Sequence, residues 1–108
     1  MAIATSTVTS PNGVNYSYRQ FFTTDAVAAA ATTFTLPFSP TKIKFVNLTD
    51  RIQDEWQLGM TAANSLHTVA AGTVTLEATN GITVSGNTFT VTATTMVASK
   101  TFYVEASA

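Results

Sequence analysis

Short stretches in which apolar and polar residues alternate dominate this chain. A period of two places successive side chains on opposite faces of a β-strand. The segments 33–38 and 42–48 follow it well, with Phe34 and Phe45 on their apolar faces. The same pattern predicts further strands over 14–22, 51–58, 65–70, 73–78, 81–85, 88–94 and 100–106.

The residues between these segments are typical of tight turns. Asn80-Gly81 and Ser85-Gly86-Asn87 provide the positive-φ positions that tight hairpins require, so we expect a hairpin at each. Ala71-Gly72 separates two other strands in the same way. The sequence therefore predicts a succession of antiparallel hairpins in the second half of the chain.

The segment 51–58 fits two structures. Asp50 could cap a helix that ends at Gly59, and Ile52 and Trp56 would share one face of it. A strand would also place Ile52 and Trp56 on one face, with Asp54 as the one polar misfit. We favour the strand because it pairs with 42–48 as a hairpin across a turn at Thr49-Asp50.

Eight or nine short strands at regular spacing predict an all-β fold. The expected architecture is a β-sandwich or jelly-roll-like domain of about eight short antiparallel strands, spanning residues 14–108. A chain of 108 residues is the usual size of one domain. Residues 1–13 are small and polar and end in a Pro-Asn-Gly turn at Asn12 and Gly13, so we expect them to form an extended N-terminal arm. The core is predicted to contain Phe34, Phe38, Phe45, Phe89 and Phe102.

The chain is unusually poor in charge. Asp, Glu, Lys and Arg make up 10% of it, against roughly 25% in an average domain, and the net charge is −1. This balance disfavours nucleic acid as a partner. No apolar run is long enough to span a membrane, and the first residues do not resemble a secretory signal. A surface so low in charge indicates that an oligomer or a larger assembly covers much of it.

The residues offer little support for catalysis or metal binding. There is no cysteine, and His67 is the only histidine, with no carboxylate placed beside it by the sequence. Asp50, Asp54 and Glu55 form an acidic cluster without the spacing of a calcium loop. Asp54 and Glu77 could form a glycosidase pair, but the sequence does not set their separation. We therefore expect no enzyme, no metal site and no cofactor.

Three aromatic residues are better candidates for an interface than for the core. Tyr16, Tyr18 and Trp56 each carry a polar group and have polar neighbours. Exposed aromatic rings on a β-sandwich can also stack on sugars, which keeps a carbohydrate-binding or adhesion module as an alternative. The residues alone predict an interaction or structural protein.

Three segments are similar to a group of small structural proteins of tailed bacteriophages: 42–56, 68–73 and 79–84. The first reads Lys-Ile-Lys-Phe-Val-Asn-Leu-Thr-Asp-Arg-Ile-Gln-Asp-Glu-Trp, and the resemblance extends over most of residues 40–106. This group includes capsid decoration, or cement, proteins. The resemblance contains no catalytic signature, and residues 1–39 contribute little to it.

The resemblance implies a virion protein on the outer surface of the phage head, made in the cytoplasm of a bacterial host. Decoration proteins of this kind are typically homotrimers that clamp neighbouring major capsid subunits. The expected partners are therefore copies of this chain and a phage major capsid protein, with contacts near Tyr16, Tyr18, Trp56 and the arm that ends at Asn12 and Gly13. A tail, fibre or head-completion protein is the alternative within the virion.

Overall fold

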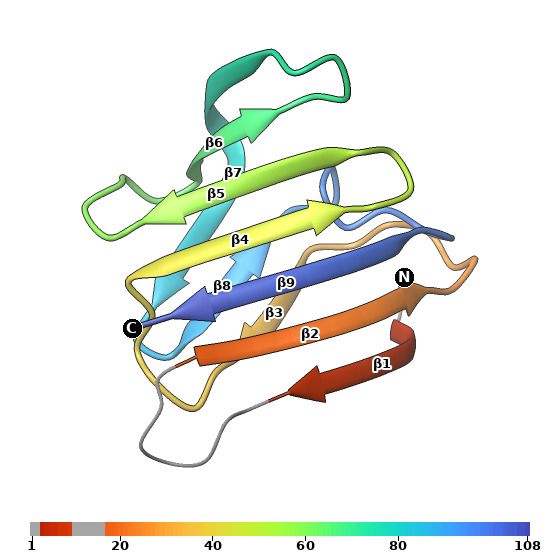
Figure 1. Cartoon of the computed structure of the whole chain (residues 1–108), viewed down its shortest axis with the longest axis horizontal. Helices are drawn as coiled ribbons and strands as arrows, with labels where there is room; N and C mark the ends of the chain where they lie inside the picture. The colour runs from red at the N-terminus through yellow and green to blue at the C-terminus, as the bar shows by residue number, and fades with distance from the viewer. Residues whose placement is uncertain (1–2, 10–16) are drawn as a thin grey trace.

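The computed structural model describes residues 3–9 and 17–108, and within them the fold is all-β without a helix (Figure 1). The predicted fold class is thus confirmed. The strands are β1 (Ile3–Thr9), β2 (Ser17–Thr24), β3 (Thr32–Thr35), β4 (Lys42–Asn47), β5 (Ile52–Gln57), β6 (Asn64–Thr68), β7 (Val74–Ser85), β8 (Thr88–Val91) and β9 (Thr101–Ser107). The segment predicted as either helix or strand is strand β5, and it pairs with β4 as a hairpin.

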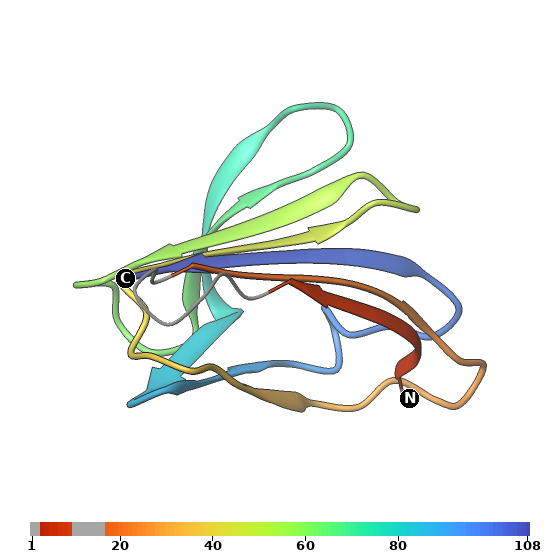
Figure 2. The ribbon, with the colours of Figure 1, turned by 60° about the horizontal axis from the view of Figure 1, so that its bottom comes forward.

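All nine strands belong to one antiparallel sheet, in the order β1-β2-β9-β4-β5-β6-β7-β8-β3. The sheet curls over, so that β8 and β3 lie beneath β2, β9 and β4 (Figure 2). Two layers therefore enclose the core, as in a sandwich, but they are parts of a single sheet. The jelly-roll arrangement of two separate sheets is not confirmed.

The sheet bends within β7. The residues from Val74 to Glu77 pair with β6, and those from Ile82 to Ser85 pair with β8 in the other layer, with Ile82 also opposite Asn64 of β6. The hairpin predicted at Asn80-Gly81 is therefore wrong, because one long strand runs through this dipeptide.

Glycine is needed at position 81 because there is no space for a side chain, and not because the chain makes a tight turn there. A Cβ atom placed on it would lie 2.4 Å from the carbonyl carbon of Asn64, so no side chain fits. The Gly81 N–H donates a hydrogen bond to the Ala63 carbonyl at 2.8 Å. Close approach of two backbones is a known use of glycine within strands.

The other predicted turns form as expected. Gly86 has φ +60° in the two-residue turn between β7 and β8, and Gly72 has φ +92° between β6 and β7. Arg51 adopts φ +58° in the β4–β5 turn. Gly72 and Gly86 set their hairpins as the sequence predicts. Arg51 was predicted to begin the following strand but belongs to the turn, and β5 begins at Ile52.

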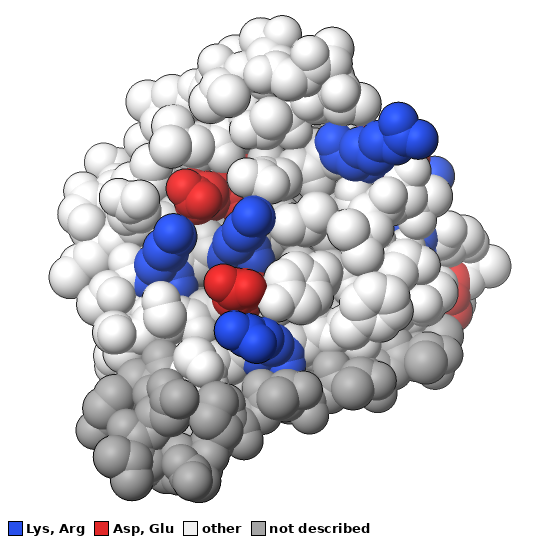
Figure 3. Space-filling view, viewed as in Figure 1, with Lys and Arg blue, Asp and Glu red and all other residues white. Residues whose placement is uncertain are grey.

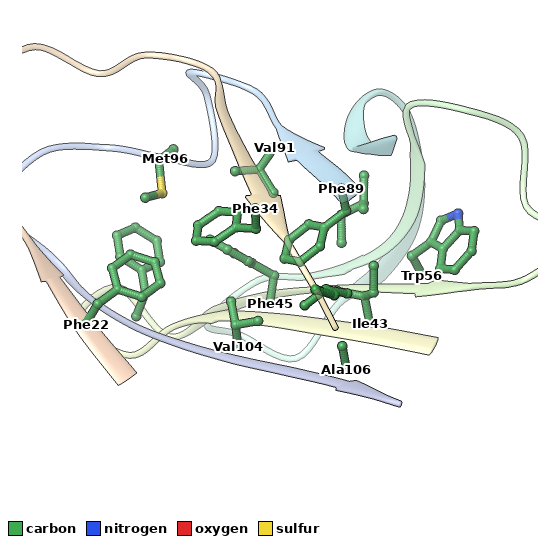
Figure 4. Packing of buried hydrophobic residues seen from close by; sticks show 13 residues of the cluster. Phe22, Phe34, Ile43, Phe45, Trp56, Phe89, Val91, Met96, Val104 and Ala106 are labelled. Carbon is green, nitrogen blue, oxygen red and sulfur yellow. The ribbon is translucent and has the colours of Figure 1, made fainter. Parts of the chain in front are cut away.

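Phenylalanine rings fill the space between the two layers (Figure 4). Phe34 stacks on Phe89 with ring centroids 4.9 Å apart, and Phe22 stacks on Phe102 at 5.3 Å. Phe45 packs against both pairs. The core predictions for Phe34, Phe45, Phe89 and Phe102 are confirmed, and Phe38 is partly buried against the same cluster.

Part of the predicted arm is a strand. Residues 3–9 form β1, which pairs with β2 at one end of the sheet. Asn12, Gly13 and Tyr16 lie outside the described residues. The division into an arm over 1–13 and a domain over 14–108 stays a prediction.

Candidate functional site

The β6–β7 hairpin, formed by β6 and the first part of β7 (residues 64–77), extends beyond the aromatic core (Figures 1 and 2). Leu66 and Leu76 lie directly opposite each other in its register. Leu76 is 61% exposed and Val74 is 58% exposed, and Leu66 and Val69 are also exposed. The hairpin therefore presents large apolar side chains to solvent.

These side chains follow the alternation seen in the sequence. Val74 and Leu76 lie on the predicted apolar face of the strand, but no described segment of the chain covers this face. Residues 66–76 include no Asp, Glu, Lys or Arg. A two-stranded hairpin that buries so little is only marginally stable on its own, and an exposed apolar patch of this kind is typical of an interaction site.

Charged side chains gather on a different part of the same face (Figure 3). Arg19, Glu105, Lys44 and Glu55 occupy adjacent register positions across β2, β9, β4 and β5. The signs alternate along this row, and Arg19 Nε lies 3.9 Å from a carboxylate oxygen of Glu105. Such exposed pairs contribute little to stability. They keep the central strands hydrated, in contrast to residues 66–76 of the hairpin, which include no Asp, Glu, Lys or Arg.

The predicted interface residues do not gather at the hairpin. Trp56 is only 4% exposed and belongs to the core, so its ring is not on the surface where a partner could contact it. Tyr18 is partly buried against the core, and its hydroxyl donates to Gln20 Oε1 at 2.8 Å. This burial raises the pKa of Tyr18. The polar neighbours that suggested an interface for Trp56 are its neighbours in sequence. The alternation of β5 is equally consistent with a ring that faces the core.

Beneath the hairpin, three polar side chains form a network that the sequence did not reveal. Ser65 Oγ donates to Asp54 Oδ1 at 2.8 Å, and His67 Nδ1 lies 2.9 Å from the same oxygen. Because a carboxylate only accepts, His67 must donate here through Nδ1. The pairing of β5 with β6 places Asp54 directly opposite His67. The sequence placed no carboxylate beside His67, and the register of β5 and β6 supplies one.

This network differs from the arrangement that activates a serine nucleophile. In a catalytic triad the imidazole lies between the serine and the carboxylate. Here Asp54 lies between Ser65 and His67, and Ser65 is fully buried. The hydrogen bonds therefore hold Asp54 and orient the imidazole ring, and they do not prepare Ser65 for attack.

A cavity of about 240 Å³ opens beside this network. Asp54, His67, Glu77 and Asp50 line its polar side. Asp50 is itself held, because Lys100 Nζ lies 3.2 Å from one of its oxygens and Asn47 Nδ2 donates to the other at 2.9 Å. The register of β5, β6 and β7 brings together acidic residues that are 23 positions apart in sequence, Asp54 and Glu77.

Glu77 is held in its charged form by the backbone of the bend in β7. The N–H groups of Asn80 and Thr79 donate to its Oε2 at 3.2 and 3.1 Å. These bonds, that of Asn80 first, lower the pKa of Glu77 below its ordinary value of 4.5, and His67 adds to the effect. Burial acts in the opposite direction but does not prevail.

No group of three or more His, Asp or Glu residues in 3–9 and 17–108 has the geometry to hold a metal ion. Within the same residues no helix is long and apolar enough to span a membrane. Comparisons of the chain with protein families, with curated proteins and with solved structures found no match.

Proposed function

We propose that this chain is a structural, partner-binding protein of a tailed-phage virion, and most specifically a capsid decoration (cement) protein. The observation that carries the proposal is the uncovered apolar face of the β6–β7 hairpin, with Leu66, Val74 and Leu76 exposed. A chain with 10% charged residues gains solubility when such a face is buried in an assembly. The resemblance of residues 40–106 to small phage structural proteins supplies the particular role.

In this role the protein forms a homotrimer on the outside of the phage head and links neighbouring major capsid subunits. Closed cyclic symmetry lets each copy offer one surface to a neighbour and another to the capsid. The stacked phenylalanine core resists deformation, while the hairpin provides apolar area for a contact. The protein would thus stabilise the shell by contact alone.

The oligomeric part of the proposal is tested by light scattering across a dilution series. We expect a trimer for the natural chain and a monomer for the double variant Leu66→Ser/Leu76→Ser, with the folding free energy changed by less than about 0.5 kcal/mol per exposed site. Leu58→Ser is the matched control, because Leu58 is 71% exposed but lies outside the hairpin. A natural chain that remains monomeric, or a double variant that remains trimeric, would contradict the hairpin contact.

The virion role is tested on particles. Mass spectrometry of purified phage from cultures that carry this gene should detect the chain, and immunogold labelling should place it on the head. Labelling of the tail instead would favour the alternative virion component. Absence of the chain from purified particles would overturn the virion role.

A further inference from the structure

The cavity beside Asp54 and His67 has the size of one side chain. Its volume of about 240 Å³ far exceeds the roughly 30 Å³ share of a water molecule. It is smaller than the roughly 300 to 1,000 Å³ of sites for whole small molecules. A group of a few heavy atoms therefore fits it best.

Asp54 has an unused oxygen in this cavity. Its side chain is 4% exposed, and both of its hydrogen bonds, from Ser65 and His67, reach Oδ1. Oδ2 accepts no hydrogen bond from any residue that the structure describes. Among the described residues only Thr92 Oγ1 is fully buried without a partner, so Asp54 Oδ2 keeps access to the cavity and can accept a hydrogen bond there. A bond from a cationic donor to this carboxylate oxygen is stronger than one between neutral groups.

The charges around the cavity are not balanced. Lys100 compensates Asp50, with which it forms an ion pair. Asp54 and Glu77 then share one imidazole, that of His67. Glu77 Oε2 accepts only backbone N–H groups, which carry no full charge. The lining therefore holds at least one negative charge without a cation.

The remaining wall of the cavity is apolar. Phe45, Ile52 and Val97 contribute to it, next to the carboxylates. An apolar wall beside unbalanced carboxylates suits a donor-rich cation on an aliphatic stem, because the stem replaces water on the apolar wall and the cation pairs with the carboxylates.

We propose that this cavity is a binding site for an aliphatic ammonium or guanidinium group, held by Asp54 and Glu77 and packed against Phe45, Ile52 and Val97. The group would come from a lysine or arginine side chain of a partner protein or from a free polyamine. Asp54 of β5 and His67 of β6 lie on one face of the sheet, and Leu66 and Leu76 lie on the other, as the strand register requires. Cation binding is therefore separable from the contact proposed for the apolar face.

Nuclear magnetic resonance titration of the full chain tests this site at constant pH in an amine-free buffer. His67 is the only histidine, so its ring signals are identified without ambiguity. The probes are butylguanidinium and butylammonium chloride, with 1-butanol and sodium butyrate as neutral and anionic controls. We expect both cations to shift the His67 signals saturably, and neither control to do so.

Substitution of the lining carboxylates tests which of them binds the cation. Asp54→Asn should weaken cation binding by about tenfold or more, which corresponds to about 1.4 kcal/mol, and Glu77→Gln should weaken it several-fold. Glu55→Gln is the matched control, because it removes the same charge from the outward face of the same strand. If Asp54→Asn fails to fold, Glu77→Gln alone tests the site. Glu77 is bonded only to the backbone of the bend, so its substitution should leave the fold intact.

Two further ligands identify the source of the cation. Tighter binding of a blocked Leu-Arg-Leu peptide than of spermidine assigns the cavity to a partner's basic side chain, whereas the reverse order assigns it to a free polyamine. The proposal is overturned if the natural chain shows no saturable shift with the cations, or if butanol shifts the signals equally. It is also overturned if folded Asp54→Asn and Glu77→Gln variants bind as well as Glu55→Gln.

Discussion

The central strands and the β6–β7 hairpin are built from similar alternating sequences, yet they bury their apolar residues to very different extents. Phe22 and Phe102, on β2 and β9, are fully buried because β3 and β8 form a second layer beneath them. Leu76, on β7, has the same place in the alternation but is 61% exposed. Alternation thus determines which face of a strand is apolar, and the curl of the sheet determines whether that face is covered.

This difference separates stability from binding in one small domain. The stacked phenylalanines belong to the buried core, and a domain of this size is stable by only about 5–15 kcal/mol. The hairpin contributes little to that core, so its surface can change without unfolding the domain. Substitutions in the two regions should therefore have unlike consequences.

The largest effect is expected in the core. Phe102→Ala should reduce the free energy of unfolding by about 3–5 kcal/mol, because it removes a fully buried ring that stacks on Phe22. Urea denaturation followed by Trp56 fluorescence measures the change. A loss as small as that of the Leu66→Ser/Leu76→Ser variant would show that the two regions do not differ as described.

An intermediate effect is expected at the bend that joins the two regions. Gly81→Ala should cost about 3 kcal/mol, because the new methyl group meets the backbone of Asn64, which cannot move aside cheaply. Hydrogen exchange should increase in the β6–β7 hairpin more than in β2 and β9. Gly86→Ala is the control: it meets no neighbour within 4 Å, and its φ of +60° should cost roughly 1 kcal/mol. Equal losses at the two glycines would contradict the close approach at Gly81.

The smallest effect is expected from pH and is confined to the bend. The folded pKa of Glu77 lies below its ordinary value of 4.5, so its charged form stabilises the fold above that pH. This contribution is lost as the pH falls through the folded pKa. Exchange of the Thr79 and Asn80 amides should therefore accelerate in acid, after correction for intrinsic rates. Glu77→Gln should abolish this acceleration and Glu55→Gln should not.

Much of the fold could be predicted from the sequence, because strand alternation and turn residues are local signals. The strand over 51–58, the turn at Gly86 and the phenylalanine core all follow from them. Asn80-Gly81 misled because the same dipeptide suits a tight turn and a close backbone approach, and only the position of Asn64 distinguishes the two.

The candidate cavity depends on contacts that no local signal specifies. Asp54 and His67 meet because β5 and β6 pair in one particular register. One signal was present: Asp54 was the single acidic residue on an otherwise apolar face shared with Ile52 and Trp56. A carboxylate on a buried face needs hydrogen-bond donors around it, so Asp54 at this position indicated a buried polar network. The identity of the donors required the structure.

The position of β9 has a consequence for biosynthesis. This strand, residues 101–107, lies between β2 and β4, so it joins β1 and β2 to the rest of the sheet. While the ribosome has not yet synthesised it, β2 lacks one of its two neighbouring strands and the ring of Phe22 lacks Phe102. Pairings between strands so distant along the chain also form slowly. The nascent chain can close its β4–β5 hairpin early, but it completes its core only after residue 107 has been added.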